Sequence, residues 1–358
     1  MSLLSKLGIK KNTRSNAITY LIVIVAFVLF TILSNGGVLG RKTVGLLVPA
    51  CCYIVMAISL NLTVGILGEL SLGHAGFMSV GAFAGVVAST GLSSTITSAP
   101  LRLAVAMVIG ALFAAIAGFL IGIPVLRLRG DYLAIVTLAF GEIIKEIISC
   151  LIVGTDEKGL HIVFNYNGAK TVDDLGLTPT GTAIIKGAQG ATGTQTIASF
   201  AAGFVLIMVA LVIVLNFVNS RSGRAVMAIR DNRIAAESVG INITKYKMIA
   251  FTISAAIAGA AGALYGLNYS NITSAKFDFN TSILILVFVV LGGLGNIRGS
   301  IISATVLYVL PEALREFADY RMLVYAIVLI LVMIATNSSK VRTLLTRLLP
   351  HKREKEVD

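Results

Sequence analysis

Tryptophan is absent from this sequence, and charged residues are scarce. Asp, Glu, Lys and Arg make up 13% of the 358 residues, against about 25% in a typical soluble domain. Hydrophobic residues make up 56%, and the mean hydropathy is +0.91. Without Trp, ten Tyr and sixteen Phe remain as aromatic residues for a membrane interface. This composition excludes an ordinary soluble domain and indicates a protein that crosses a membrane several times.

Cysteines and nucleotide-binding motifs are also few. The three cysteines, Cys51, Cys52 and Cys150, have a spacing that suits neither a metal site nor a structural disulfide. The stretch GGLGNIRG (292–299) lacks the full glycine fingerprint of a dinucleotide site and the βαβ unit that would surround it. No Gly-Lys-Ser/Thr phosphate loop occurs in the sequence. We therefore expect a protein that is not an enzyme, with no catalytic residue, metal or cofactor of its own.

The formal net charge is +12, and most of it lies in three short blocks: the N-terminus, residues 221–247 and the C-terminal tail. Basic blocks beside apolar spans are typical of cytoplasmic loops. Binding to nucleic acid is the alternative, but no block interleaves aromatic residues with the basic ones. The charge therefore predicts an orientation in the membrane rather than a nucleic-acid partner.

Long apolar runs are the dominant pattern. A helix needs about 20 apolar residues to cross the hydrocarbon core of a bilayer. Runs that approach this length lie near residues 17–34, 44–66, 71–90, 102–124, 132–153, 197–218, 248–268, 282–294, 299–315 and 322–337. The sequence thus predicts an all-α fold, a polytopic bundle of about ten membrane segments.

The basic blocks orient these segments. With the N-terminus in the cytoplasm, we expect a cytoplasmic stretch 1–16, a membrane domain 17–337 and a basic cytoplasmic tail 338–358. Within the membrane domain, residues 220–247 then face the cytoplasm, and the polar stretch 154–196 forms an outer loop.

The same orientation has exceptions and a symmetry. Arg41, Lys42 and Arg102 fall on the outer side, so the charge rule holds only as a bias. Segments one to five start inside and segments six to ten start outside, so we expect two halves with inverted orientation.

Each half contains a glycine-rich interruption, GILGELSLGHAG (65–76) in the first and VLGGLGNIRG (290–299) in the second. Inverted halves with broken helices favour a translocation site at their interface. The candidate pathway residues among these glycines are Gly73, Gly76, Gly293 and Gly295. Close packing of helices through small residues is the alternative for any single glycine.

Two ionisable groups join the pathway candidates. His74 is the only histidine placed within a predicted span, and such groups are costly in a membrane and often functional. A neutral histidine hydrogen-bonded between helices would give the same sequence. Glu142 and Glu146 share a helix face, and Lys145 lies three residues from Glu142. Acid–base chemistry is conceivable at this spacing, but a self-neutralised cluster near the outer end of a span is favoured, with Glu142 kept as a pathway residue.

The cytoplasmic segment contains a pattern for a short helix. Asp231 is a suitable N-cap, Gly240 is a suitable residue to follow the helix, and Arg233 and Glu237 can pair. A small apolar surface is expected from Ala235, Ala236 and Val239. Such a helix can dock into a groove on a soluble partner, and a solvated basic loop is the alternative. The candidate coupling residues are Arg230, Asp231, Arg233, Ala235, Ala236, Glu237 and Gly240.

Several stretches in order resemble a known family. They are SLNLTVGILGELSLGHAGFMSVGAFAG, GDYLAIVTLAFGEI, GRAVMAIRDNRIAAESVGI, FTISAAIAGAAGALYG and VLGGLGNIRGS. Together they resemble the permeases of branched-chain amino acid ABC importers, and most closely the M-type subunit. The family's coupling segment falls on residues 235–240, with the glutamate placed after the alanines, unlike the general ABC-permease order. The family's Leu-Gly-His stretch falls on residues 72–74, which the resemblance places beside the pathway.

The resemblance implies a set of partners in the inner (plasma) membrane of a prokaryote. These are an H-type permease in a heterodimer, two ATP-binding cassette ATPase subunits and an extracytoplasmic substrate-binding protein. We therefore expect a permease subunit for branched-chain or hydrophobic amino acids that forms half of the pathway. The alternatives are a permease for urea, amides or another small solute, a secondary transporter, and a membrane enzyme, for which no catalytic cluster is found.

Overall fold

The structure, a computed structural model, describes residues 11–36, 40–128, 130–156, 159–165, 168–179 and 181–313, together with four isolated helical positions beyond them. The chain divides into two compact units, Met1–Thr305 and Val306–Asp358, and the account below concerns the first. The predicted tail 338–358, nearly all of the predicted span 322–337 and the first ten residues lie outside the described residues.

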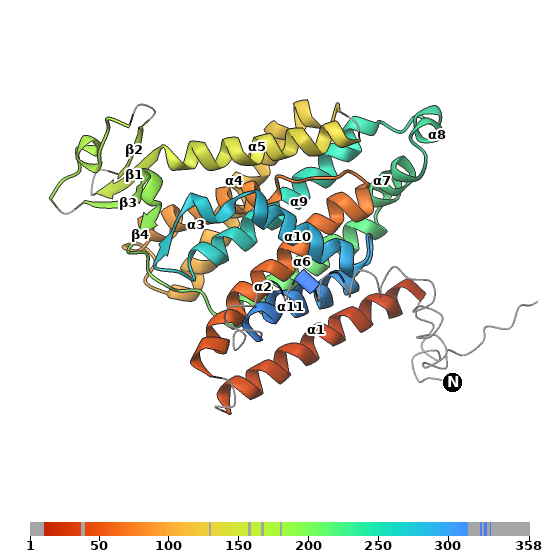
Figure 1. Cartoon of the computed structure of the whole chain (residues 1–358), viewed down its shortest axis with the longest axis horizontal. Helices are drawn as coiled ribbons and strands as arrows, with labels where there is room; N and C mark the ends of the chain where they lie inside the picture. The colour runs from red at the N-terminus through yellow and green to blue at the C-terminus, as the bar shows by residue number, and fades with distance from the viewer. Residues whose placement is uncertain are drawn as a thin grey trace, which may run out of the picture. The chain divides into compact units, whose positions relative to one another are not determined.

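The described part of the chain is mostly helical (Figure 1). Its α-helices are α1 (Lys11–Asn35), α2 (Arg41–Asn61), α3 (His74–Gly91), α4 (Ala99–Val125), α5 (Asp131–Ser149), α6 (Phe200–Asn219), α7 (Arg221–Asp231), α8 (Arg233–Ser238), α9 (Ile243–Gly266), α10 (Phe279–Gly292) and α11 (Ile297–Ala313). Each predicted segment that begins before residue 315 overlaps one of these helices, although the bounds differ.

Within the described residues, five stretches are long and apolar enough to cross a membrane: Asn16–Ser34, Thr43–Leu67, Ala99–Val125, Phe200–Asn219 and Ile243–Gly266. The helix Phe279–Gly292 is apolar but shorter. The structure therefore supports a multi-span helical protein, and ten crossings in two inverted halves stay a prediction.

The prediction of an all-α fold is wrong in and around the segment 154–196, which was predicted to be an outer loop. A five-stranded antiparallel sheet with the order β2-β1-β3-β4-β5 is built from β1 (Leu151–Asp156), β2 (Gly159–Phe164), β3 (Thr182–Lys186), β4 (Ala191–Thr192) and β5 (Asn271–Ile272). The predicted span 132–153 ends early, because α5 stops at Ser149 and the apolar run that follows pairs with β2 and β3. Short runs rich in Ile, Val and Thr suit a half-buried sheet, and hydropathy alone does not distinguish them from the end of a span.

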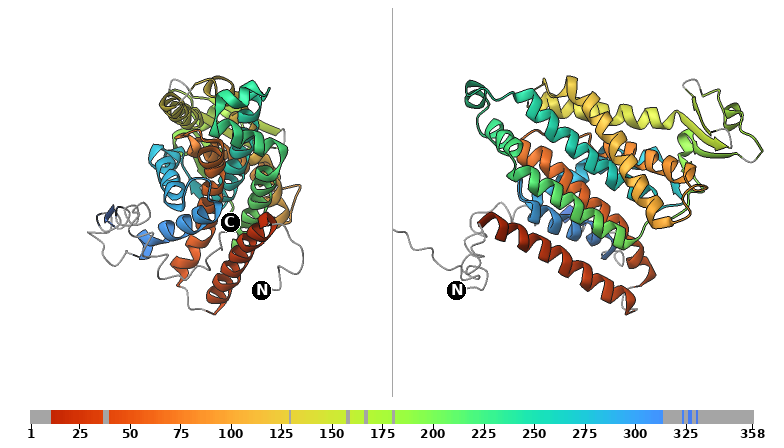
Figure 2. Two further views of the ribbon diagram at one scale, coloured as in Figure 1. Left: turned by 90° about the vertical axis from the view of Figure 1, so that its right-hand side faces the viewer. Right: turned by 180° about the vertical axis from the view of Figure 1, so that it is seen from behind.

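The last strand ties the sheet to a distant part of the chain. Ala191 of β4 pairs with Ile272 of β5, which follows α9. The Thr194 hydroxyl adds a hydrogen bond of 2.7 Å to the carbonyl oxygen of Tyr269. Figure 2 shows α6 and α9 running between this sheet at one end and the α7–α8 pair at the other. The predicted outer loop and cytoplasmic segment therefore lie at opposite ends of the first unit.

Three glycines lie at the centre of the bundle, where α9 packs closely against α3 and α4. A Cβ atom added to Gly81 would lie 2.0 Å from the carbonyl oxygen of Gly259, and one added to Gly259 would lie 2.5 Å from that of Gly110. Glycine thus lets three backbones approach more closely than any side chain allows, which is a common way to pack helices in membranes.

This packing predicts a large difference between two alanine variants of α3. Gly81→Ala should lower the free energy of unfolding by about 1–3 kcal/mol, because the added methyl group meets backbone that cannot yield. Gly91→Ala in the same helix is the control, since nothing lies within 4 Å of its added Cβ. Thermal unfolding of the purified full chain in detergent measures both. Equal midpoints for the two variants would contradict the packing argument.

Candidate functional site

The first glycine-rich interruption is a break between α2 and α3. After Asn61 the helix widens into a π-helical turn, η2 (Leu62–Leu67), and it ends at Gly68, which has a φ of +80°. Residues 69–73 are not helical, and α3 begins at His74. A π-helical turn is uncommon and often marks a functional site. The predicted interruption is therefore present, and we call residues 62–73 the first break.

The second interruption lies between α10 and α11. Gly293 and Gly295 have φ values of +92° and +78°, a region that favours glycine, and α11 begins again at Ile297. We call residues 293–296 the second break. Both predicted pathway glycines of this stretch therefore have a backbone role, and their place in a pathway stays a prediction.

The two breaks contact each other directly. The Asn61 side chain accepts a hydrogen bond of 2.8 Å from the backbone N–H of Gly295 and donates one of 2.8 Å to the Ser300 hydroxyl. A Cβ atom added to Gly65 would lie 2.2 Å from the backbone nitrogen of Gly295. Asn61 and Ser300 are fully buried. Two segments more than 200 residues apart in sequence are therefore joined by a buried polar side chain that the sequence did not single out.

Arg230 connects α7 to the first break. Its Nη1 donates a hydrogen bond of 3.0 Å to the carbonyl oxygen of Gly65, which the π-helical turn carries. A Cβ atom on Gly68 would lie 2.6 Å from the Arg230 Cγ, so glycine makes room for the stem of this side chain. The same guanidinium pairs with the Asp231 carboxylate at 2.9 Å. The last turn of α7 is thereby fastened to the interrupted helix.

A buried ion pair joins the first break to α9. The Lys247 ammonium in α9 pairs with the Glu69 carboxylate. Only 5% of the lysine side chain and 14% of the glutamate side chain are exposed. Neither residue was singled out from the sequence, because the partners lie 178 positions apart. The feature of the sequence that could have indicated this ion pair is a charged residue inside an apolar stretch.

His74 lies in a buried hydrogen-bond network between helices. It is 1% exposed, and its Nε2 lies 2.9 Å from the Ser59 hydroxyl of α2. Ser59 in turn donates to the Ser254 carbonyl oxygen of α9, and Thr63 donates to the Ser254 hydroxyl. The geometry matches the structural alternative stated from the sequence, a histidine held between helices. A role for His74 in the pathway stays a prediction.

The glycines beside His74 serve close packing of α3 on α5. A Cβ atom on Gly73 would lie 1.9 Å from the carbonyl oxygen of Thr137, and one on Gly76 would lie 3.0 Å from the Gly141 Cα. The Thr137 hydroxyl also accepts a hydrogen bond of 3.0 Å from the Leu72 N–H. The structure therefore gives Gly73 and Gly76 a packing function, and their place in a pathway remains a prediction.

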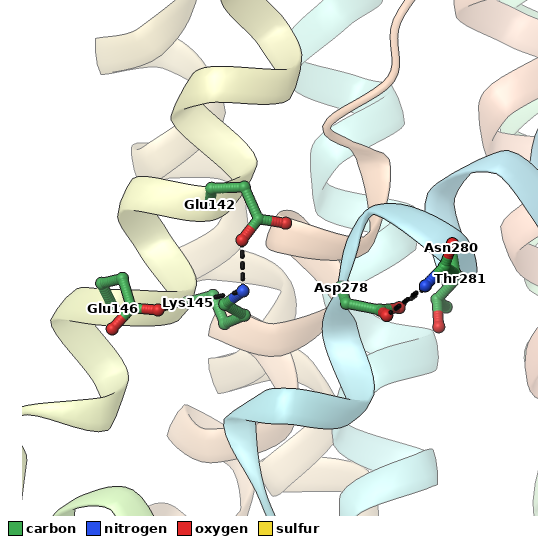
Figure 3. Close-up of polar contacts among 6 residues, drawn as sticks. All are labelled: Glu142, Lys145, Glu146, Asp278, Asn280 and Thr281. Atoms are coloured by element: carbon green, nitrogen blue, oxygen red, sulfur yellow. Dashed lines mark hydrogen bonds and ion pairs between the residues drawn. The ribbon is translucent and has the colours of Figure 1, made fainter.

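Glu142 belongs to a charged cluster on α5 that faces the start of α10 (Figure 3). Lys145 forms an ion pair with Glu142, as the spacing predicts, and its Nζ lies 3.8 Å from a carboxylate oxygen of Glu146. Asp278 caps α10 by accepting a hydrogen bond of 2.9 Å from the Thr281 N–H. Lys145 thus offsets one of the three acidic side chains, so the cluster keeps a net negative charge, and a pathway role for Glu142 stays a prediction.

Asp278 is held ionised at this cluster. Partial burial raises the pKa of its carboxyl group, but hydrogen bonds from Thr281 and Asn280 outweigh this and leave the pKa below its ordinary value. A permanent negative charge at this position also suits the N-terminus of α10, where the helix dipole is positive.

The predicted short helix is present as α8, but its N-cap is one residue later than predicted. Asp231 is the last residue of α7, and Asn232 is the N-cap of α8, accepting a hydrogen bond of 3.0 Å from the Ala235 N–H. Asn and Asp are about equally good caps, so the sequence did not distinguish them. Gly240 ends the helix with a φ of +82°, as predicted. No ion pair joins Arg233 to Glu237, both of which the structure describes.

One face of α8 is buried and the other is open. Ala236 packs with Ile229 and Ile243 in a small apolar cluster, so α8 is held against α7 and α9. Ile234 and Val239 are 81% and 74% exposed. Two large aliphatic side chains are thus exposed on the open face of α8.

A metal site has no support among the described residues, where no group of three or more His, Cys, Asp or Glu side chains could hold an ion. The residues that converge are instead those of the two breaks, Arg230 and the buried polar network. This arrangement suits movement of helices rather than bond chemistry.

Comparison with known proteins identifies the family. The model of a family described as "Branched-chain amino acid transport system / permease component" matches residues 42–333. The chain belongs to this family. Among its relatives is the high-affinity branched-chain amino acid transport system permease protein LivM of Escherichia coli K12, which is 34% identical over 301 residues, 82% of this chain and 69% of that protein.

Two further relatives are more distant. The probable branched-chain amino acid transport permease protein LivM of Methanocaldococcus jannaschii is 25% identical over 75% of this chain and 80% of its own length. The permease protein LivH of Escherichia coli K12 is 33% identical over 36% of this chain and 42% of its own length. No solved structure matches the chain.

Membership of the family decides the class of function. The chain is a permease component of a branched-chain amino acid ABC transport system, which is a transport protein rather than an enzyme. With its candidate spans, it is a multi-pass membrane protein homologous to bacterial inner-membrane permeases.

Proposed function

We propose that this chain forms half of the translocation pathway of an ATP-driven importer that carries branched-chain or other hydrophobic amino acids. The proposal rests on the family and on relatives whose names state this transport. The other half is an H-type permease, two ATPase subunits drive the cycle, and an extracytoplasmic binding protein delivers the cargo. Related H-type permeases are named among the relatives of this chain.

The proposed topology follows the predicted domains. The stretch 1–16 and the tail 338–358 lie in the cytoplasm, the membrane domain spans 17–337, and the coupling segment is 220–247. Residues 154–196 then face the outside with the sheet. The separation of the sheet from α8 supports this arrangement, because it sets the two segments at opposite ends of α6 and α9 (Figure 2).

The single observation that carries the mechanism is the contact from Arg230 to the first break. In the proposed cycle, closure of the ATPase subunits moves α8, which presents Ile234 and Val239 to them. Packing of Ala236 on Ile229 passes this motion to α7. Arg230 then pulls on the π-helical turn, and Asn61 transmits the change to the second break.

A charge placed on the open face of α8 tests this proposal. Ile234→Asp should reduce co-purification of the ATPase subunits and cut ATP-driven uptake about tenfold or more, because a desolvated apolar contact is replaced by a carboxylate. Pull-down from membranes and uptake into proteoliposomes of the complete transporter measure the two effects. Ile162→Asp on β2 is the matched control, since Ile162 is 54% exposed on the sheet.

Two outcomes would overturn the proposal. One is normal ATPase binding and normal uptake with Ile234→Asp. The other is uptake that continues without ATPase subunits and collapses when an ion gradient is removed, which would indicate a secondary transporter.

A further inference from the structure

The outer end of the first unit contains a cavity of about 650 Å³. It lies between the end of α3 and the strands β3 and β4, which pack side by side (Figure 1). Its polar lining includes Ser89, Thr90, Thr182, Lys186, Thr192 and Gln195. We call this space the outer cavity. Its volume is in the range of sites for small molecules.

The chemistry of the lining favours an anion. Among the lining residues that the structure describes, Lys186 alone is charged, and none is Asp or Glu. The Lys186 ammonium makes no ion pair with any residue in the described ranges. Asp174, close to the lining residue Val172 in sequence, already accepts a hydrogen bond of 2.6 Å from the Thr171 N–H. An unneutralised cation among hydroxyl groups is suited to a carboxylate.

A buried arginine stands behind this lining. Arg102 is 6% exposed, and its Nη2 donates a hydrogen bond of 2.6 Å to the Gln195 side-chain oxygen. Its Nε is buried without a hydrogen-bond partner. Because the amide oxygen of Gln195 is taken by Arg102, the amide nitrogen is left to donate to a ligand. Arg102, an exception to the expected distribution of basic residues, therefore orients Gln195 and adds a second positive charge near the cavity.

We propose that the outer cavity binds the carboxylate of a small organic acid, and that in the working transporter this is the amino acid cargo on its way into the pathway. The identity of the cargo rests on the proposed function, whereas the carboxylate chemistry rests on Lys186, Gln195 and Arg102. Lys186 supplies the positive charge, and Gln195 supplies an N–H donor for the carboxylate. The surrounding hydroxyl groups can donate further hydrogen bonds to the carboxylate or accept them from the ammonium group of the cargo. A carboxylate side chain of the binding protein has the same chemistry, and the experiment separates the two sources.

Thiol accessibility at the cavity tests this assignment without the binding protein. Ser93, an exposed lining residue, is changed to Cys in a Cys150→Ser background, where the remaining Cys51 and Cys52 are buried. The purified full chain in lipid nanodiscs is treated with an anionic and a cationic methanethiosulfonate. We expect the anionic reagent to react at least about fivefold faster, because the Lys186 ammonium attracts an anion and repels a cation.

Ligand protection identifies the group that is recognised. Leucine and 4-methylpentanoate, which carry a carboxylate, should slow modification, and isoamylamine, which has none, should not. Lys186→Gln should remove both the charge preference and the protection. Lys170→Gln is the matched control, because Lys170 lies in the same outer segment but does not line the cavity.

The outcomes separate this inference from the proposed function. No charge preference, or equal protection by isoamylamine, would overturn the carboxylate site. Protection that appears only when the binding protein is added would overturn the assignment to cargo. Either result, with ATP-driven uptake of leucine intact in the complete transporter, would leave the proposed function standing.

Discussion

Replacing Glu69 with alanine should lower the free energy of unfolding by about 3–5 kcal/mol, because it leaves the Lys247 ammonium buried without its partner. Removing both charges should restore most of the stability, since an ion pair and two apolar side chains of similar volume are often equivalent in a buried site. The double variant is Glu69→Met with Lys247→Met. Thermal or denaturant unfolding of the full chain in detergent measures the series.

A surface ion pair of the same type provides the control. Glu146 is 69% exposed where it approaches Lys145, so Glu146→Ala should change stability by about 1 kcal/mol or less. The argument fails if Glu69→Ala unfolds at the same midpoint as the unaltered protein, or if the double variant is as unstable as the single one.

Replacing Arg230 with alanine should uncouple the transporter. We expect ATP-driven uptake to fall about tenfold or more, with the ATPase subunits still bound and still hydrolysing ATP. The hydrogen bond to the Gly65 carbonyl oxygen involves a charged donor, and such bonds contribute about 1.5–3 kcal/mol. Without it, movement of α7 no longer reaches the first break. Uptake and ATP hydrolysis are measured together in proteoliposomes.

The same helix offers a matched control for this prediction. Arg224 is also in α7, but its guanidinium donates to the carbonyl oxygen of Asn219 at the end of α6 and does not reach the break. Arg224→Ala should therefore keep uptake near normal, and Arg230→Lys should retain part of it because an ammonium still donates one hydrogen bond. Normal uptake by Arg230→Ala would show that coupling takes another route.

The helices were predictable from the sequence because the apolar runs have the length that a bilayer requires. The sheet was not, since a run such as LIV at 151–153 is equally compatible with the last turn of a span and with a strand. Only the pairing partners, β2 and β3, decide between the two, and sequence order does not give them.

For the site too, features that depend on the local sequence were predictable, and features that depend on distant partners were not. The glycine patterns indicated both breaks, and Gly240 indicated the end of α8, because each needs a backbone conformation that favours glycine. Asn61, Glu69 and Lys247 were missed because their roles depend on partners far away in the chain. The sequence placed His74 within a predicted span, but its hydrogen bond to Ser59 depends on how α2 packs against α3, which the sequence does not give.

The strand that follows α9 has a mechanical consequence. Because β5 is hydrogen-bonded to β4, one sheet joins the ends of α5, α6 and α9 that lie beside it, and separating these ends would break backbone hydrogen bonds. Among the described residues no sheet joins the opposite ends, beside α7 and α8, which are connected through side chains such as Arg230. We therefore expect the helices to move least at the end that the sheet holds together and most at the end beside α8.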